Sequence, residues 1–236
     1  TFTCEGSKQV GAETVVCNGV HGEQDFEQAL ANSCNVAFAE IAAQLGPDRL
    51  TKYVRQIGIT SRISFDGTTT AAGSFDLSKA TTYEAAWAGV GQYTDQINPC
   101  QYMTLMGAIA NGGQAAKPYL VESVTFGDSK KYGVSRTMLD RAMSGAAADR
   151  LTEMMHYAVE NVYGDWYFTG LYAGGKSGTA EVGNGEPANG LFAGFVQDED
   201  YPLAFVVVVE KGGGGAASCL PVISDVLDAC VASMQE

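Results

Sequence analysis

Apolar residues near the start of the chain recur at the spacing of α-helices. This spacing predicts one helix over residues 23–31 and a second over residues 36–45. The residues between them, 32–35, are polar, and we expect a turn there. Gly46 and Pro47 predict the end of the second helix, since glycine and proline both interrupt a helical pattern.

The middle of the chain has a less regular pattern. Residues 60–96 are rich in Thr, Ser, Gly and Ala, and their length predicts a functional surface segment rather than a simple connection. Pro99 predicts the first turn of a helix that ends near residues 111–113. Residues 119–126 predict a strand, and residues 146–161 predict another helix.

In the last third of the chain the pattern of apolar residues changes to one typical of β-strands. Residues 173–182, 191–197 and 203–210 predict three strands with short polar connections, and residues 220–234 predict a closing helix. The third strand is apolar on both faces, which predicts a central strand that is covered on both sides. Together these elements predict an α/β fold in which a central antiparallel sheet is flanked by helices.

Composition narrows the class of protein. The chain has 236 residues, 46% of them hydrophobic, which suits a folded domain with a buried core. Its 14 basic and 27 acidic residues give a net charge of −13, which argues against nucleic acid and anionic lipid as partners. No stretch reaches the roughly 18 uninterrupted apolar residues of a membrane span.

The six cysteines and two histidines form no local metal-binding pattern. No C-x-x-C pair occurs, and His21 and His156 are far apart in the sequence, so we expect no metal and no cofactor. A disulfide between Cys4 and Cys17, which would close a small loop, and two unpaired buried thiols are equal alternatives.

The strongest chemical signal is Lys176-Ser177-Gly178-Thr179, on the first strand of the last third. An ammonium group and two hydroxyl groups surround a glycine, which lets the backbone of a ligand approach the strand closely. A strand edge of this kind can pair with an extended peptide and hold its terminal carboxylate by charge-assisted hydrogen bonds. Alone, the tetrapeptide fits a solvated strand followed by a turn equally well.

A second signal, Ser33 and Asn35, lies in the predicted turn between the first two helices. The serine hydroxyl can pass a proton, and the asparagine amide can donate and accept hydrogen bonds at once. Helix capping is the alternative interpretation, and it is favoured for this pair alone because Ser and Asn are both good N-caps.

The two motifs in this order resemble those of the penicillin-binding proteins and serine β-lactamases, whose signature combines S-x-x-K, S-x-N-type and K-T-G-type motifs. The resemblance is closest to the monofunctional, class B penicillin-binding proteins and spans nearly the whole chain. We therefore expect residues 1–236 to form part of a penicillin-binding transpeptidase domain. The flanking segments that share the resemblance are residues 29–38, 98–103, 110–113, 117–121, 176–182, 191–195 and 208–210.

The resemblance implies a peptidoglycan D,D-transpeptidase. In such a reaction a serine attacks the D-Ala-D-Ala bond of a stem peptide, and the acyl group then passes to the amine of a neighbouring stem. β-Lactam antibiotics mimic the substrate and trap the acyl-enzyme. Ser33 would relay protons to the leaving group, and Asn35 would orient the substrate amide and the lysine beside the nucleophile.

The strand motif would bind the substrate. Lys176 would supply positive potential, and the hydroxyl groups of Ser177 and Thr179, on either side of Gly178, would hold the substrate carboxylate. The Thr179 N–H would form half of the oxyanion hole. Stem peptides, β-lactams and other cell-wall synthesis proteins are the implied partners, at the extracytoplasmic face of the bacterial membrane with the anchor outside this chain.

One part of the signature is missing from the printed sequence, which contains no Ser-x-x-Lys. In the family this tetrad precedes the Ser-x-Asn motif, so the resemblance implies that it lies upstream of Thr1. We then expect an N-terminally truncated domain that is inactive by itself. A catalytically inactive scaffold that binds peptides is one alternative, and a β-lactamase or β-lactam sensor is another.

Other residues have weaker support. Gln92 lies in a segment that the family places near the active site. Glu181 follows the strand motif directly, and both a cleft-facing and a solvent-exposed side chain fit its position. The aromatic residues before the motif, including Tyr163, Trp166 and Phe168, fit either the lining of the cleft or core packing, and core packing is the favoured interpretation.

Overall fold

The largest sheet of the molecule is antiparallel and has three strands. The computed structural model describes residues 1–183 and 185–235. The strands are β9 (Ala173–Ala180), β10 (Asn189–Gln197) and β11 (Pro202–Val209), in the order β11-β10-β9. β10 is therefore the central strand and pairs with both neighbours along its length.

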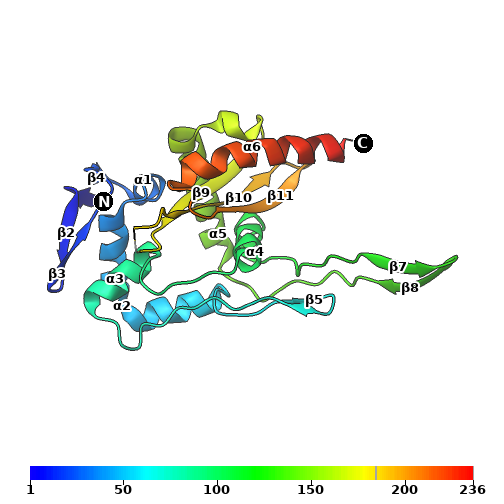
Figure 1. Ribbon diagram of the computed structural model, residues 1–236, viewed down its shortest axis with the longest axis horizontal. Coiled ribbons are helices and arrows are strands. Elements are labelled where there is room, and N and C mark those ends of the chain that lie inside the picture. Colours follow the sequence, from blue (N-terminus) through cyan, green and yellow to red (C-terminus); the bar gives the residue numbers. More distant parts are fainter. Residues whose placement is uncertain (184, 236) are drawn as a thin grey trace.

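Alternate side chains of β10 build two hydrophobic layers on opposite faces of this sheet. Phe192 packs against α6 (Gly215–Met234), whereas Phe195 packs against α4 (Pro99–Ala110) and α5 (Gly145–Ala158). The opposite orientation follows from the two-residue period of a strand. Figure 1 shows α6 on one side of the sheet and α4 and α5 on the other, as an α/β fold with helices on both faces requires.

The prediction that residues 203–210 form the central strand is wrong, because β11 lies at the edge of the sheet. Its two faces are nevertheless partly covered, since Phe205 packs in the layer below α6 and Val206 in the layer beside α4. An apolar run indicates that both faces of a strand are covered. It does not indicate which strands lie beside it.

α6 is also long and apolar enough for a membrane span, with a mean hydropathy of 1.5. In the described part of the molecule it buries Leu220, Ile223 and Leu227 in the layer above the sheet. A core helix of a folded domain has the same length and composition. We therefore assign α6 to the core.

The N-terminal region consists of two small antiparallel sheets of two strands each and a short helix. β1 (Phe2–Cys4) pairs with β4 (Gly22–Gln24), and β2 (Ser7–Val10) pairs with β3 (Glu13–Val16). The helix α1 (Phe26–Ala31) follows β4 directly. Because β1 and β4 enclose β2 and β3 in the sequence, both ends of this region return to the same place, next to α1 (Figure 1).

The next helix, α2 (Asn35–Gln56), contains the break that the sequence predicts. Gly46 has φ 75° and ψ 162°, which are not helical values, and Pro47 begins the second segment. A positive φ is readily adopted by glycine and disfavoured for other residues. The expected helix end at Gly46-Pro47 is thus a kink between two helical segments.

The segment 60–96, predicted to be irregular, contains a helix, α3 (Thr82–Val90), that packs against α2. Its start has a capping box: the Thr81 side chain accepts from the Glu84 backbone N–H, and the Glu84 side chain accepts from the Thr81 N–H. This T-x-x-E pattern is a sequence signal for a helix start, and the composition of the segment obscured it.

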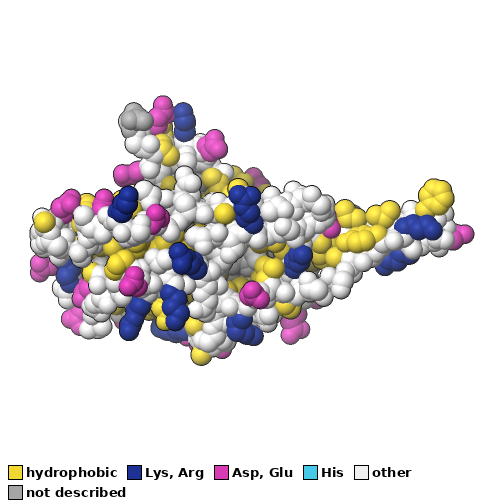
Figure 2. All heavy atoms as spheres, turned by 90° about the horizontal axis from the view of Figure 1, so that it is seen from below, with side chains coloured by type: hydrophobic (Ala, Val, Ile, Leu, Met, Phe, Trp, Pro, Cys, Tyr) yellow, Lys and Arg dark blue, Asp and Glu magenta, His cyan; other side chains and the backbone are white. Residues whose placement is uncertain are grey.

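The remaining elements are short. They include a hairpin formed by β7 (Ser123–Phe126) and β8 (Ser129–Gly133). The residues of both strands are exposed, and the hairpin projects from the body of the molecule (Figure 1). Figure 2 shows hydrophobic side chains and basic residues interspersed along this projection. The other short elements are β5 (Ser64–Phe65), β6 (Thr68–Thr69), the π-helix η1 (Val159–Tyr163) and the 3₁₀-helix η2 (Asp165–Phe168).

The predicted fold class is thus confirmed in its broad form, a mixed α/β domain. The prediction of one central sheet holds only in part. The described strands form the three-stranded sheet and four separate two-stranded sheets.

Candidate active site

The two sequence motifs meet at one point in the structure. The Lys176 ammonium on β9 donates a hydrogen bond to the Ser33 hydroxyl, which lies 143 residues earlier in the sequence. The same ammonium donates to the Tyr163 hydroxyl at 3.2 Å and to the Ser177 carbonyl at 2.8 Å. A cation, two hydroxyl groups and a strand edge therefore form one polar cluster.

Ser33 is held in an unusual backbone conformation. It follows α1 in the left-handed region, with φ 52°, which is disfavoured for residues other than glycine. Its backbone N–H donates to the Leu30 carbonyl at 3.1 Å, and the next N–H, that of Cys34, donates to the Ala29 carbonyl at 3.0 Å. These two bonds close the end of α1 and point the Ser33 side chain toward Lys176.

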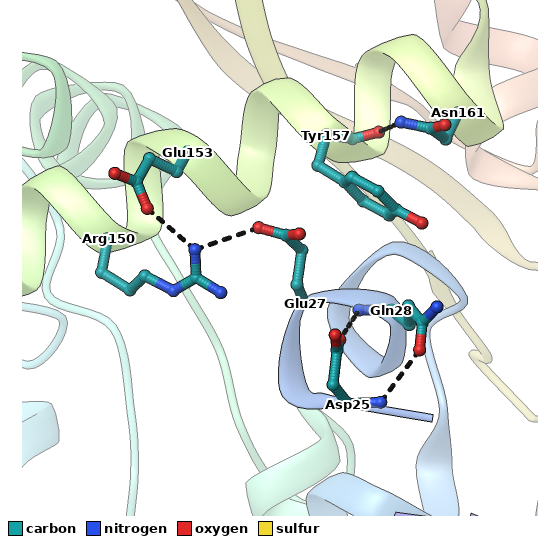
Figure 3. A network of polar contacts seen from close by, with 7 residues as sticks. All are labelled: Asp25, Glu27, Gln28, Arg150, Glu153, Tyr157 and Asn161. Carbon is teal, nitrogen blue, oxygen red and sulfur yellow. Dashed lines mark hydrogen bonds and ion pairs between the residues drawn. The ribbon is translucent and has the colours of Figure 1, made fainter. Parts of the chain in front are cut away.

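The position of Ser33 depends on how α1 is attached to the rest of the domain. Arg150 on α5 bridges Glu27 on α1, at 3.1 Å, and Glu153 on its own helix, at 2.8 Å. At the start of α1, Asp25 and Gln28 form a reciprocal capping box. Figure 3 shows both networks, which fix the start of α1 and attach it to α5.

Asn35 is the predicted site residue that the structure does not connect to Lys176. It is the first residue of α2 and is half-buried. Its amide donates to the Val16 carbonyl at 3.0 Å, at the end of β3. In this structure Asn35 therefore links the β2–β3 hairpin to the turn that contains Ser33.

Tyr163 belongs both to the core, as favoured from the sequence, and to the polar cluster. Its hydroxyl accepts from the Ser177 backbone N–H at 3.1 Å and lies 3.0 Å from the Ser177 hydroxyl. Burial would raise the pKa of the Tyr163 phenol, but the nearby Lys176 ammonium and the bonds with Ser177 lower it overall. The sequence signal for this role was weak: a buried tyrosine hydroxyl requires a polar partner, but its identity is set by the fold.

Thr179 lies two residues beyond Ser177, so its backbone groups point toward the same open edge of β9. Its carbonyl accepts a hydrogen bond from the Gln92 side chain at 3.2 Å. Its hydroxyl oxygen accepts from the Gly215 N–H, at the start of α6, at 3.0 Å. The Thr179 hydroxyl proton remains available to a ligand, and Gln92 lies at the site as the resemblance suggested.

Gly178, the remaining motif residue, has its carbonyl oxygen against the start of α6. A Cβ on Gly215, the first residue of α6, would lie 1.9 Å from the Gly178 carbonyl oxygen, so only glycine fits there. Glu181 is exposed just beyond β9, and Trp166 is 73% exposed rather than in the core. Phe168, by contrast, is fully buried, as predicted.

Comparison with known proteins identifies the family. The penicillin binding protein transpeptidase domain family matches residues 1–228. The chain belongs to this family. The resemblance to class B penicillin-binding proteins inferred from the two motifs is thereby confirmed.

Two curated relatives illustrate the similarity of this penicillin-binding transpeptidase domain. It is 30% identical over 198 residues to the peptidoglycan D,D-transpeptidase PbpA of Mycolicibacterium smegmatis, covering 80% of this chain and 39% of that protein. It is 26% identical over 243 residues to stage V sporulation protein D of Bacillus subtilis, covering 96% of this chain and 37% of that protein. The chain thus spans less than half the length of these relatives.

Solved structures share the fold. The D,D-transpeptidase domain of a peptidoglycan glycosyltransferase from Eggerthella lenta has a TM-score of 0.83 at 26% identity, covering 99% of this chain and 60% of that one. Penicillin-binding protein A of M. tuberculosis, solved as a ceftriaxone acyl-enzyme complex, has a TM-score of 0.88 at 24% identity. That match covers 97% of this chain and 55% of the other, and it supports the fold alone.

The transpeptidase domain also contains a half-buried acid, Asp95. One oxygen of Asp95, Oδ1, is buried and has no hydrogen-bond partner among the described residues. Burial raises the pKa of Asp95 to about 7. An unfolded aspartate ionises near pH 3.9, so the folded state binds one more proton between about pH 4 and pH 7. This group therefore makes stability fall as the pH rises through that window.

We expect Asp95→Asn to remove this contribution. Relative to the parent protein, the free energy of unfolding of the variant should be similar at pH 4 and higher by about 1 kcal/mol at pH 8. This is well below the roughly 4 kcal/mol of the full pKa difference, because Asp95 is only partly buried and solvent screens its charge. Urea denaturation at both values measures the difference. Asp128→Asn, on the exposed β7–β8 hairpin, is the matched control and should not change how the free energy of unfolding varies with pH. Parallel stability curves for Asp95→Asn and the parent would contradict the prediction.

Proposed function

We propose that this chain is the substrate-binding part of a peptidoglycan D,D-transpeptidase, which transfers stem-peptide acyl groups through a serine acyl-enzyme. The hydrogen bond between Lys176 and Ser33 at the open edge of β9 is the observation that supports it best. It places a cation and a proton-relay hydroxyl beside backbone groups that can pair with an extended peptide. Membership of the transpeptidase family supports the same reaction.

In this proposal each residue of the cluster has a defined task. Lys176 attracts the terminal carboxylate of the stem peptide or the carboxylate of a β-lactam, and the Ser177 and Thr179 hydroxyl groups donate to it. Ser33 passes a proton to the departing D-Ala amine, and the adjacent Lys176 ammonium keeps the Ser33 oxygen polarised. Asn35 orients the substrate amide, for which it exchanges its bond to the Val16 carbonyl.

The oxyanion that forms on the scissile carbonyl requires donors at the strand edge. The Thr179 N–H points toward this edge and supplies one donor. Removal of one such donor typically lowers the rate by about 100- to 1,000-fold. The second donor would be the N–H of the nucleophilic serine.

The nucleophile itself is proposed to lie outside these 236 residues, because the printed sequence contains no Ser-x-x-Lys. This chain alone should then bind the substrate without turning it over. The proposed location is the extracytoplasmic face of the bacterial membrane, where peptidoglycan stem peptides, β-lactams and other cell-wall synthesis proteins are available. The longer relatives named as peptidoglycan D,D-transpeptidases support this proposal.

A labelling experiment on the full-length gene product tests the proposal. A fluorescent penicillin should form a stable covalent adduct, and peptide mass spectrometry should locate it on a serine of a Ser-x-x-Lys tetrad outside residues 1–236. Ser33 should remain unmodified, because its role is proton transfer. An adduct on Ser33 would contradict the assignment of roles.

The same experiment separates the alternatives. Full-length protein without any adduct, and without a Ser-x-x-Lys, would indicate an inactive scaffold. An adduct that is hydrolysed within seconds would indicate a β-lactamase. Stable labelling without exchange of D-Ala on a synthetic stem peptide would indicate a β-lactam sensor.

A further inference from the structure

Four potential metal ligands meet directly behind the turn that contains Ser33. They are Cys4 at the end of β1, Cys17 after β3, His21 before β4 and Cys34 at the N-cap of α2. The ligand atoms of all four lie within 4.8 Å of one another. The residues come from four separate segments, so the fold gathers them and no short sequence motif contains them.

The distances between these atoms suit a single tetrahedral ion. The Cys17 sulfur lies 3.9 Å from the Cys34 sulfur and 3.7 Å from His21 Nδ1. A zinc ion with Zn–S bonds of about 2.3 Å and Zn–N bonds of about 2.0–2.1 Å requires ligand separations of roughly 3.5–3.8 Å. The two Cys17 distances are already close to these values, and no two ligand atoms need to approach each other by more than roughly 1.3 Å to enclose an ion.

Burial and the state of the sulfurs also favour a metal. Cys4 and Cys34 are fully buried, and Cys17 and His21 are half-buried, so the site is shielded but can be reached from one side. All the cysteines of the chain are free thiols in this structure, and the alternative of a Cys4–Cys17 disulfide is not formed. Three thiols and an imidazole converging on one point are more than hydrophobic packing requires.

We propose that Cys4, Cys17, His21 and Cys34 bind one structural zinc ion. Thiolate and imidazole ligands in a closed set of four are typical of structural zinc sites. As each thiol becomes a ligand its proton is released to solvent, and the ion remains Zn²⁺ throughout, so no oxidant or reductant is needed. The sequence analysis expected no metal because it looked for C-x-x-C pairs, whereas these ligands are adjacent only after folding.

The ion would connect the N-terminal strands to the turn that contains Ser33. Cys34 lies between Ser33 and Asn35, and its N–H bond to the Ala29 carbonyl is one of the two that close the end of α1. A metal–sulfur bond at Cys34 would restrain this turn and maintain the positive φ of Ser33. Zinc would then position Ser33 against Lys176, and this consequence for catalysis rests on the proposed function.

Metal content is the direct test. The full-length gene product should be purified without a polyhistidine tag under reducing conditions. Inductively coupled plasma mass spectrometry should then find one zinc per chain. After zinc removal, added Co²⁺ should produce the intense visible bands of tetrahedral cobalt and the near-ultraviolet bands of cobalt–thiolate bonds. A protein that contains no zinc and gives no such spectrum would overturn the proposal. So would two missing thiols per chain in place of the metal, since they would indicate a disulfide.

Substitutions locate the ion. His21→Ala and Cys17→Ser should weaken Zn²⁺ binding at least tenfold in a competition with a chromogenic chelator, whereas Cys230→Ser on α6 should leave it unchanged. His21 and Cys17 are half-buried, so their variants are expected to fold, and circular dichroism checks this. Unchanged Zn²⁺ affinity in folded His21→Ala would overturn the assignment of the ligands.

Hydrogen exchange tests the effect on the turn without any assay of activity. Removal of zinc should accelerate exchange of the Ser33 and Cys34 amides at least tenfold and leave β10 unchanged. Unchanged exchange at the turn would overturn the positioning role. The two proposals can fail separately: zinc binding with no acylation by penicillin contradicts the proposed function alone, whereas acylation without any bound metal contradicts the zinc site alone.

Discussion

Replacement of Lys176 by alanine should reduce the rate at which a fluorescent penicillin acylates the full-length gene product by at least about 100-fold. The Lys176 ammonium contacts the Ser33 and Tyr163 hydroxyl groups and the Ser177 carbonyl, so its removal takes away the positive potential and the organising donor together. Stopped-flow labelling at several drug concentrations measures the second-order rate constant.

A matched variant distinguishes this effect from a general loss of charge. Lys130→Ala removes an equal charge from the exposed β7–β8 hairpin and should retain the parent rate. Lys176→Ala should also keep the parent melting temperature to within a few degrees, because the side chain is only partly buried. Acylation of Lys176→Ala at the parent rate would refute the role of the strand motif.

Phe192→Ala should produce the largest loss of stability. Phe192 is fully buried on the central strand β10 and packs against the rings of Tyr163, Phe168 and Phe205. Loss of a buried phenylalanine typically costs about 3–5 kcal/mol, through lost burial and the cavity that remains. In a domain of this size the melting temperature should then fall by about 10 °C, as measured by calorimetry.

An exposed phenylalanine provides the control for Phe192. Phe126 on the β7–β8 hairpin is 79% exposed, and its replacement by alanine should change stability by less than about 0.5 kcal/mol. If Phe192→Ala leaves too little folded protein, Phe192→Leu should show the same trend with a smaller loss. Equal melting temperatures for the Phe192 and Phe126 variants would contradict the assignment of the core.

The sequence predicted much of this structure, and the errors have physical causes. Most helices and strands could be predicted from the spacing of apolar residues and from glycine or proline, and so could the break at Gly46. The order of strands did not, because the partners of β11 depend on topology and not on its own apolar residues. α3 was missed because the composition of residues 60–96 outweighed the capping signal at Thr81.

The candidate site shows the same limit. Ser33 and Lys176 were paired through a family resemblance, because 143 residues of intervening chain prevent any inference of contact from spacing. The hydrogen-bond partners of Tyr163 and the cysteine cluster could not be predicted for one reason: the sequence shows what a side chain can do, and only the fold shows what it contacts. Gln92 was placed correctly by resemblance, but its contact with the Thr179 carbonyl required the structure.

The occupied edge of β9 has a consequence for how a substrate is selected. Gln92 already bonds to the outward Thr179 carbonyl, and Lys176 and Tyr163 bond to the outward carbonyl and N–H of Ser177. An incoming peptide must displace these side chains, so it exchanges hydrogen bonds and gains few new ones. Reversible affinity should therefore be low for correct and incorrect peptides alike. Discrimination between them would then arise at the covalent step, as a difference in the rate of capture.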